Sequence, residues 1–294
     1  MAQQPPTDAS RIAHTRSLLH GQTPCIMAIV NVTPDSFSDG GIFFDGGQLQ
    51  LARVIDRAAR LIADGADLLD IGGESTRPGA TPVSVTEELS RVVPVIEALA
   101  ARFAVPLSVD TSEPRVMRAA VVAGATLIND VRALSRPYAL ATAAELVREA
   151  GVFVCLMHSR GEPGSMDELA RYASVVTEVR DELMSRVQAA QSAGIDPKQI
   201  VLDPGFGFAK NSAQNYTLFR GLSQLAALGF PLLVGVSRKR MIGELLNLPV
   251  AAERVLGSAV LAALAVERGA RIVRVHDVRE TAQALRLFAA IEPF

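Results

Sequence analysis

The sequence predicts a single α/β domain, a closed (β/α)8 barrel of parallel strands with long loops after strands one and two. Eight short apolar runs end abruptly in polar residues, and a helix-like stretch follows each of them. Strands that alternate with helices form parallel sheets, and eight such units favour closure over an open, doubly wound sheet. No shift in composition divides the 294 residues, a length that fits one barrel.

The polar endings are the main guide to function. They lie at Asn31, Asp70, Asp110, Asn129-Asp130, Met157-His158, Asp203, the segment leading to Ser237, and His276. In a barrel of parallel strands all carboxyl ends meet at one rim, where active sites of this fold lie. We therefore expect side chains from eight distant places in the sequence to surround one pocket.

Apolar residues at helical spacing predict the helices between these strands. The first covers 51–62, and the second opens at Thr86 with Pro94 indicating a kink or a late start. Ser112 is expected to cap the third. Single helices are expected over 169–193 and 211–228, and Asp277 with Glu280 resembles a capping box that opens the last helix.

The predicted helix over 253–268 is apolar nearly all round, which is typical of a helix buried on two sides. Barrel helices normally expose one face to water. Either a partner subunit or a neighbouring loop is expected to cover this one.

Charge and the termini limit the class of protein. Lys and Arg total 29 against 31 Asp and Glu, which argues against nucleic acid or an anionic membrane as a partner. Residues 1–20 lack the apolar stretch of a signal peptide, and no run reaches the ~20 apolar residues that span a bilayer. We expect a flexible tail over 1–20, a barrel over 21–294, and a cytoplasmic location.

Cys25 and Cys155 fall in or beside apolar runs, which predicts buried free thiols in a reducing compartment.

One set of rim residues suits a flat heterocycle: Asp110, Asn129, Asp203 and Lys239. A carboxylate can accept two parallel N–H bonds from an amino-imino edge, and an amide can donate to one ring atom while accepting from the next. An ammonium can reach a ring carbonyl. Lys239 would alternatively suit a Schiff base.

A second set suits an anion: Asn31, Thr76, Arg77, Arg274 and His276. Arg274 and His276 lie just before the last helix, whose positive end favours negative charge, although such an end contributes only about 0.3–1 kcal/mol. A polyanion therefore needs the Arg and a metal as well. The glycine-rich loops over 33–41 and 72–80 are expected to close over the substrate, and Asp70 to support the second of them. His158 suits a structural role better than that of a general base, because the sequence offers it no orienting partner.

At these residues the chain resembles the dihydropteroate synthases of folate synthesis, from Ile26 to Ile291. The matching motifs are NVTPDSFSDGG at 31–41, DIGGESTRPG at 70–79, INDV at 128–131, LDPGFGF at 202–208, GVSRK at 235–239 and RVHDV at 274–278. Six motifs in this order, at barrel spacing, are highly specific. One departure is Ala209, where the family usually has a second glycine.

The resemblance implies a transferase that joins a dihydropterin-CH2-diphosphate to 4-aminobenzoate, releasing diphosphate, in a homodimer that sulfonamides target. It implies that Asp110, Asn129, Met157, Asp203, Lys239 and Arg274 bind the pterin, that Asn31, Thr76, Arg77, Arg274 and His276 bind the diphosphate, with Mg2+ on Asn31, and that Phe37, Pro78, Phe208 and Ser237 shape the aminobenzoate slot. Asp110, Lys239, Arg274 and His276 would be catalytic. The alternatives are a pterin-binding methyltransferase barrel and a catalytically silent pterin-binding barrel.

Overall fold

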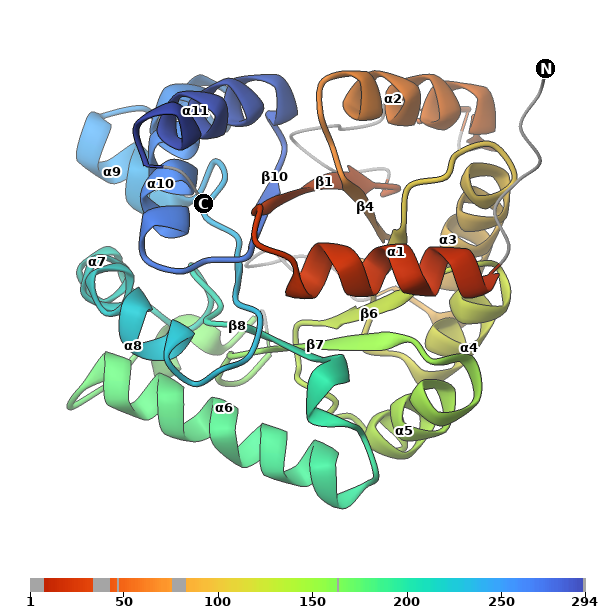
Figure 1. Cartoon of the computed structure of the whole chain (residues 1–294), viewed down its shortest axis with the longest axis horizontal. Coiled ribbons are helices and arrows are strands. Elements are labelled where there is room, and N and C mark those ends of the chain that lie inside the picture. Colours follow the sequence, from red (N-terminus) through yellow and green to blue (C-terminus); the bar gives the residue numbers. More distant parts are fainter. Residues whose placement is uncertain (1–7, 34–42, 47, 76–82, 163, 293–294) are drawn as a thin grey trace.

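The chain folds into a barrel of eight parallel strands surrounded by helices (Figure 1). The structure, a computed structural model, describes residues 8–33, 43–46, 48–75, 83–162 and 164–292. The barrel strands are β1 (Cys25–Asn31), β4 (Leu68–Gly72), β5 (Leu107–Asp110), β6 (Leu127–Asp130), β7 (Phe153–Met157), β8 (Ile200–Asp203), β9 (Leu233–Val234) and β10 (Ile272–Val275). A small hairpin, β2 (Phe44–Asp45) with β3 (Gln48–Leu49), follows β1. All eight predicted barrel strands are confirmed.

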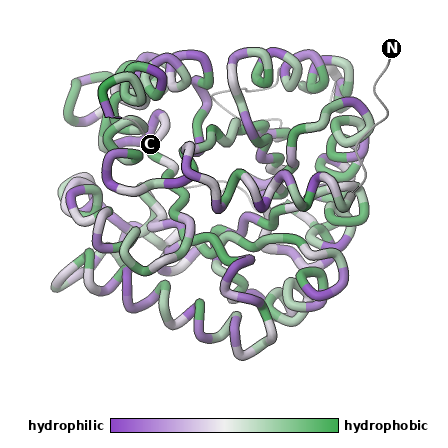
Figure 2. The backbone as a smooth tube through the Cα atoms, in the orientation of Figure 1, coloured by the Kyte–Doolittle hydropathy of each residue, from purple (hydrophilic) through white to green (hydrophobic). Residues whose placement is uncertain are grey.

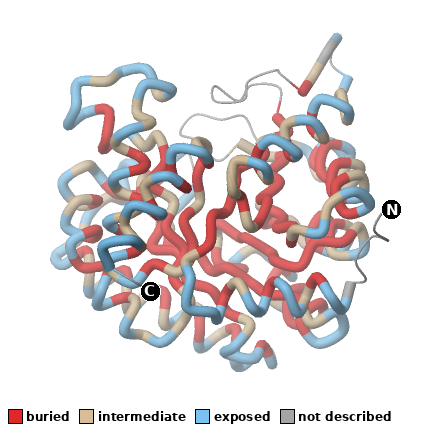
Figure 3. The backbone as a smooth tube through the Cα atoms, turned by 45° about the horizontal axis from the view of Figure 1, so that its top comes forward, coloured by how far each residue is buried: buried red, intermediate tan, exposed pale blue. Residues whose placement is uncertain are grey.

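The helices lie outside the strands and cover the barrel. They are α1 (Asp8–His20), α2 (Leu51–Ala63), α3 (Val85–Ala100), α4 (Pro114–Val122), α5 (Ala139–Ala150), α6 (Val175–Ser192), α7 (Ser212–Arg220), α8 (Leu222–Ala226), α9 (Arg240–Leu246), α10 (Val255–Glu267) and α11 (Val278–Ile291). Short 3-10 turns occur at η1 (Met166–Leu169), η2 (Pro197–Gln199) and η3 (Ala251–Arg254). The strands form the apolar, buried centre of the molecule (Figures 2 and 3).

The barrel closes through a short seam between β8 and β9. The sheet order runs β8-β7-β6-β5-β4-β1-β10-β9, and a parallel bridge between Leu202 and Leu232 joins its two ends. The amide of Leu202 donates to the carbonyl of Pro231 across this seam at 3.0 Å. Because β9 contains only Leu233 and Val234, the seam is held by few backbone hydrogen bonds.

The expected flexible tail over 1–20 is wrong for residues 8–20, which form α1. This helix lies across the amino-terminal end of the barrel (Figure 1). Leu19 packs with the apolar residues inside the barrel, and Thr15 bonds to Thr126 at 2.7 Å. The side chain of Arg11 donates to the carbonyl of Ala100. The helix was missed because its buried face is narrow and partly polar. Residues 1–7 lie outside the described part of the chain.

Three predicted helices differ in their bounds. The stretch over 211–228 is two helices that meet at Gly221, where a Cβ atom would come within 2.7 Å of Val176 on α6, so the position is packed too closely for a side chain. The stretch over 169–193 is helical only from Val175 to Ser192. Helix α3 begins at Val85, capped by Ser84, so the late start is wrong.

Two residues that were predicted to cap helices make other hydrogen bonds instead. Glu113, rather than Ser112, caps α4, while the Ser112 hydroxyl donates to Asp130. Asp277 makes no side-chain cap to α11, because its carboxylate accepts from Arg238 Nε at 2.9 Å.

No single helix in the described part of the chain is long and apolar enough to span a membrane. Only Arg240–Leu246 and Ala251–Glu267 taken together pass that test by length and composition, with a bend of 86° between them.

Candidate active site

A cavity of about 710 Å3 occupies the carboxyl-terminal mouth of the barrel. Ten of the predicted site residues line it: Asn31, Asp110, Asn129, Met157, Asp203, Phe208, Ser237, Lys239, Arg274 and His276. Phe37, Thr76, Arg77 and Pro78 lie outside the described residues, so their placement stays a prediction. The expected convergence of strand ends on one pocket is confirmed for every site residue that the structure describes.

The two-residue repeat of the strands explains this convergence. Successive side chains in a strand point to opposite faces, so every second residue faces the barrel interior. Leu68, Leu127, Phe153, Val201 and Ile272 belong to the apolar cluster that fills the amino-terminal half of the interior. Two residues further on, four of these faces carry the polar residues Asp70, Asn129, Asp203 and Arg274, whereas β7 carries Cys155, which still belongs to the apolar cluster. The strands therefore change from apolar packing to polar groups at the depth where the cavity begins.

Arg274 joins the carboxylates of two other strands at the floor of the cavity. Its Nε donates to Asp70 Oδ2 at 2.6 Å, and its Nη2 donates to Asp110 Oδ2 at 2.8 Å. Asn129 Nδ2 also donates to Asp70 Oδ2, at 3.1 Å. Burial raises the pKa of Asp110 to about 7, and the guanidinium of Arg274 opposes this rise.

The described contacts of Asp70 lie below the cavity, whereas residues 76–80 of the second loop lie outside the described part of the chain, so its predicted support of that loop stays a prediction. Its side chain is completely buried below the cavity, where it orients Arg274 and Asn129. Its other oxygen, Oδ1, is buried without a hydrogen-bond partner among the described residues.

Asp203 and Lys239 lie on either side of the seam. Asp203 Oδ1 accepts from the Gly205 amide at 2.7 Å, and Lys239 Nζ lies 4.4 Å from the centre of the Phe208 ring. Burial raises the pKa of Asp203, whereas the Gly205 amide and then Lys239 lower it. A side chain at Gly207 would come within 3.1 Å of the Lys239 stem, so this glycine lets the lysine lie against the loop after β8.

Ser237 and His276 form a pair at the end of the sheet. The amide of His276 donates to the Ser237 hydroxyl oxygen at 3.1 Å, and that hydroxyl lies 3.0 Å from His276 Nδ1. A hydroxyl that donates to Nδ1 leaves the imidazole proton on Nε2. Ser237, predicted to shape the aminobenzoate slot, thus also orients the histidine of the anion set.

The loop after β4 is anchored where the described residues end. Arg91 Nη1 donates to the carbonyl of Gly73 at 2.9 Å, and Arg132 Nη1 contacts Glu74 Oε2 at 3.4 Å. A side chain at Gly73 would come within 2.7 Å of Val92 on α3. These contacts hold the chain on the cavity side directly before the predicted anion ligands Thr76 and Arg77.

His158 does not line the cavity formed by the described residues, in keeping with a structural role. Its Nδ1 lies 2.9 Å from Lys210 Nζ, and its Nε2 lies 3.0 Å from Glu182 Oε2. Burial, and then the charge of Lys210, lowers the pKa of His158 to about 4. Sequence reasoning missed both Lys210 and Glu182, because they are 52 and 24 residues away from His158. The one feature of the sequence that pointed to Lys210 was its position directly after the predicted loop over 204–208.

Comparison with known proteins agrees with this geometry. The family model of pterin binding enzymes matches residues 27–276. The dihydropteroate synthase of Escherichia coli K12 is 49% identical over 269 residues, covering 91% of each chain. The chain belongs to the dihydropteroate synthase family.

Solved structures of the family share the fold. A Yersinia pestis dihydropteroate synthase in complex with a sulfonamide drug aligns with a TM-score of 0.87 and 47% identity, over 94% of this chain and 98% of the other. A Xanthomonas albilineans dihydropteroate synthase in complex with 7,8-dihydropteroate aligns with a TM-score of 0.79 and 44% identity, over 93% and 94%.

We predict that Asp70→Asn lowers the free energy of unfolding by about 2 kcal/mol, because it replaces a hydrogen bond between charged groups in a buried site. Urea denaturation measures this. The control is Asp181→Asn, at an exposed position on α6. A loss no larger than that of the control would show that Asp110 alone suffices to hold Arg274.

Proposed function

We propose that the chain catalyses the condensation of (7,8-dihydropterin-6-yl)methyl diphosphate with 4-aminobenzoate, giving 7,8-dihydropteroate and diphosphate. The single observation that carries this is the cavity in which a hydrogen-bonding set and an anion set converge. The family membership supports it, as does the relative solved with 7,8-dihydropteroate.

The pterin edge would lie on the floor of the cavity. Asp110, Asn129 and Asp203 are held by neighbouring donors or acceptors, so they are oriented before a ligand arrives. Lys239 would donate to ring acceptors, and Met157 would supply an apolar contact. A site of this kind rejects analogues that lack the matching groups, because its buried polar atoms would be left unpaired.

The electrostatics favour ionisation of the carbon–oxygen bond before the amine attacks. Asp110 lies at the cavity floor, where its carboxylate accepts from Arg274 Nη2 at 2.8 Å. When ionised, a carboxylate at this place would offset a positive charge that develops on the pterin methylene. Oriented charges of this type commonly supply the largest catalytic contribution.

The departing diphosphate would bind beside the pterin, within reach of Arg274 and His276. His276 is oriented by Ser237, and Arg274 has five N–H donors, of which the two carboxylates take one each. The amine of 4-aminobenzoate would then attack from the slot beside Phe208. Sulfonamides, as mimics of aminobenzoate, would compete for that slot.

The residues around Asn31 fit a magnesium ion held jointly with the substrate. A Cβ atom at Gly72 would lie 3.5 Å from Asn31 Oδ1 and 3.7 Å from Asp110 Oδ2, so both oxygens border the space that this glycine leaves open. No cluster of three metal-binding side chains occurs among the described residues, and Mg2+ commonly uses few protein oxygens together with substrate phosphates. Bound at Asn31, the ion would neutralise charge on the leaving diphosphate.

Turnover is the direct test. The purified chain should release diphosphate only when both substrates and Mg2+ are present, and chelation with EDTA should abolish the release. Release without aminobenzoate at the full rate would indicate a hydrolase. Binding without release under all conditions would indicate a silent pterin-binding barrel.

Binding measurements should separate the two sets of residues. We expect Lys239→Ala to weaken pterin diphosphate binding by about a hundredfold while free diphosphate binds as before, because the lysine is assigned to the pterin ring and not to the diphosphate. Arg274→Ala should weaken both ligands. Isothermal titration calorimetry measures these affinities, with Lys198→Ala as an exposed control. Unchanged pterin binding in Lys239→Ala would refute its assignment.

We further propose a homodimer formed through α9, η3, α10 and α11, which are neighbours in the fold (Figure 1). Large apolar side chains are exposed on these elements and the turn between them: Leu245, Leu246, Val250, Leu256, Val260, Leu264, Leu287 and Ile291. Leu256 is 76% exposed, and no described segment covers it. Apolar patches of this kind mark interaction surfaces. The buried free thiols Cys25 and Cys155 suit a reducing, cytoplasmic location.

Light scattering on a sizing column should therefore give twice the chain mass of 31.2 kDa. Leu256→Glu should shift the population to single chains, because it places a charge in the apolar contact. Val122→Glu is the matched control, since Val122 is 86% exposed on α4, away from this surface. A monomeric parent protein, or equal effects of both changes, would refute the proposed interface.

A further inference from the structure

A buried lysine at the wall of the cavity, Lys210, binds the loop after β8 through two backbone carbonyls. Lys210 is 1% exposed, and its Nζ donates to the carbonyls of Gly205 and Phe208, each at 3.0 Å. The third neighbour is His158 Nδ1, at 2.9 Å. An ammonium has three N–H donors, and here each meets one acceptor.

The loop itself has little freedom to adopt another shape. Gly205, at φ +67°, lies so close to β7 that a Cβ atom would come within 1.9 Å of the His158 carbonyl. Ala209 adopts φ +47°, a conformation that is unfavourable for a residue with a Cβ atom. Such conformations persist where surrounding contacts enforce them. The bonds from Lys210 span this alanine, so they are suited to enforce it.

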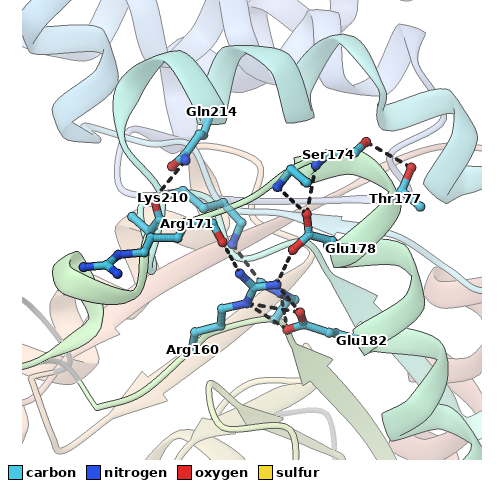
Figure 4. A network of polar contacts seen from close by, with 11 residues as sticks. Arg160, Arg171, Ser174, Thr177, Glu178, Glu182, Lys210 and Gln214 are labelled. Atoms are coloured by element: carbon cyan, nitrogen blue, oxygen red, sulfur yellow. Dashed lines mark hydrogen bonds and ion pairs between the residues drawn. The ribbon is translucent and has the colours of Figure 1, made fainter.

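The imidazole of His158, which accepts from Lys210, is oriented by Glu182 on α6, and Glu182 in turn accepts from Arg160. Glu182 accepts from His158 Nε2, which leaves Nδ1 as the acceptor for the lysine. Arg160 Nε donates to Glu182 at 3.1 Å and Arg160 Nη2 to Glu178 at 2.8 Å (Figure 4). Burial lowers the pKa of Lys210 to about 7, while Asp203 and Glu182 oppose this and favour the ammonium.

On the cavity side, the same loop carries Phe208. The Phe208 ring lies against Lys239 Nζ, and Gly207 accommodates the Lys239 stem. The Gly207 amide donates to Asn215 Oδ1 at 2.9 Å, and Asn215 Nδ2 donates back to the Lys210 carbonyl at 3.1 Å. Displacement of the loop would therefore move the aromatic wall of the cavity.

We propose that Lys210 is a positioning residue for the second substrate: through Gly205 and Phe208 it sets the place of the Phe208 ring and hence the shape of the aminobenzoate slot. This inference rests on the proposed function, in which Phe208 borders that slot. In this proposal His158 is the hydrogen-bond acceptor for Lys210, and Glu182 and Arg160 keep His158 in position.

The test is Lys210→Met, which retains the length and apolar stem of the side chain but removes its donors. We expect KM for 4-aminobenzoate to rise about tenfold while kcat changes less than about threefold. The Kd of pterin diphosphate alone should rise by a clearly smaller factor than KM, although the same loop contacts Asp203 and Lys239. Lys198→Met, at an exposed lysine before the start of β8, should leave all three constants unchanged. A folded Lys210→Met protein with an unaltered KM, or with an equal loss of pterin binding, would overturn the proposal.

A second pair of variants decides the question if Lys210→Met does not fold. His158→Asn keeps an acceptor oxygen near the position of Nδ1, whereas His158→Leu has none. The Leu variant should raise KM for aminobenzoate and the Asn variant should not; equal KM values would overturn the proposal. An inactive parent protein would instead refute the proposed function, so the two failures are distinguishable.

Discussion

The contact of Arg274 with Asp70 and Asp110 is the interaction on which the site depends. Several carboxylates in a buried barrel mouth repel one another and are costly to remove from water, so they need a cation that is also buried. Arg274 reaches Asp70 and Asp110, which stand on β4 and β5. It thereby joins three strands at the cavity floor, and it fixes the carboxylate that is proposed to meet the pterin.

This constraint also divides the barrel interior into two layers. Below Asp70 the interior is apolar and ends at α1, whose Leu19 closes it. Above Asp70 the interior is polar and open to the cavity. The lower layer supplies packing that does not depend on a ligand. The upper layer can therefore retain groups such as Asp70 Oδ1 that lack a partner among the described residues, at the cost in stability typical of functional sites.

The barrel and most of its rim were predictable because the relevant information is local. Each apolar run ends in a polar residue. The two-residue repeat of a strand places that residue on the face that points into the barrel, as with Leu127 and Asn129 or Val201 and Asp203. The roles of Asp70 and Lys210 were not predictable in this way. Asp70 acts on a residue 204 positions away, and Lys210 on one 52 positions away. Helix α1 likewise depends on contacts with distant segments, which no local pattern in the sequence indicates.

The seam between β8 and β9 has a consequence for how the barrel moves. Local opening begins where backbone hydrogen bonds and apolar contacts are fewest, and in this sheet that place is the short strand β9. Asp203 and Lys239 stand on opposite sides of the seam. A ligand bound by both residues would join β8 to β9 through hydrogen bonds, where the sheet has the fewest backbone hydrogen bonds of its own. Such a ligand would suppress local opening of the seam, so the amides around Leu202 and Leu232 would exchange with solvent more slowly with the cavity filled than with it empty.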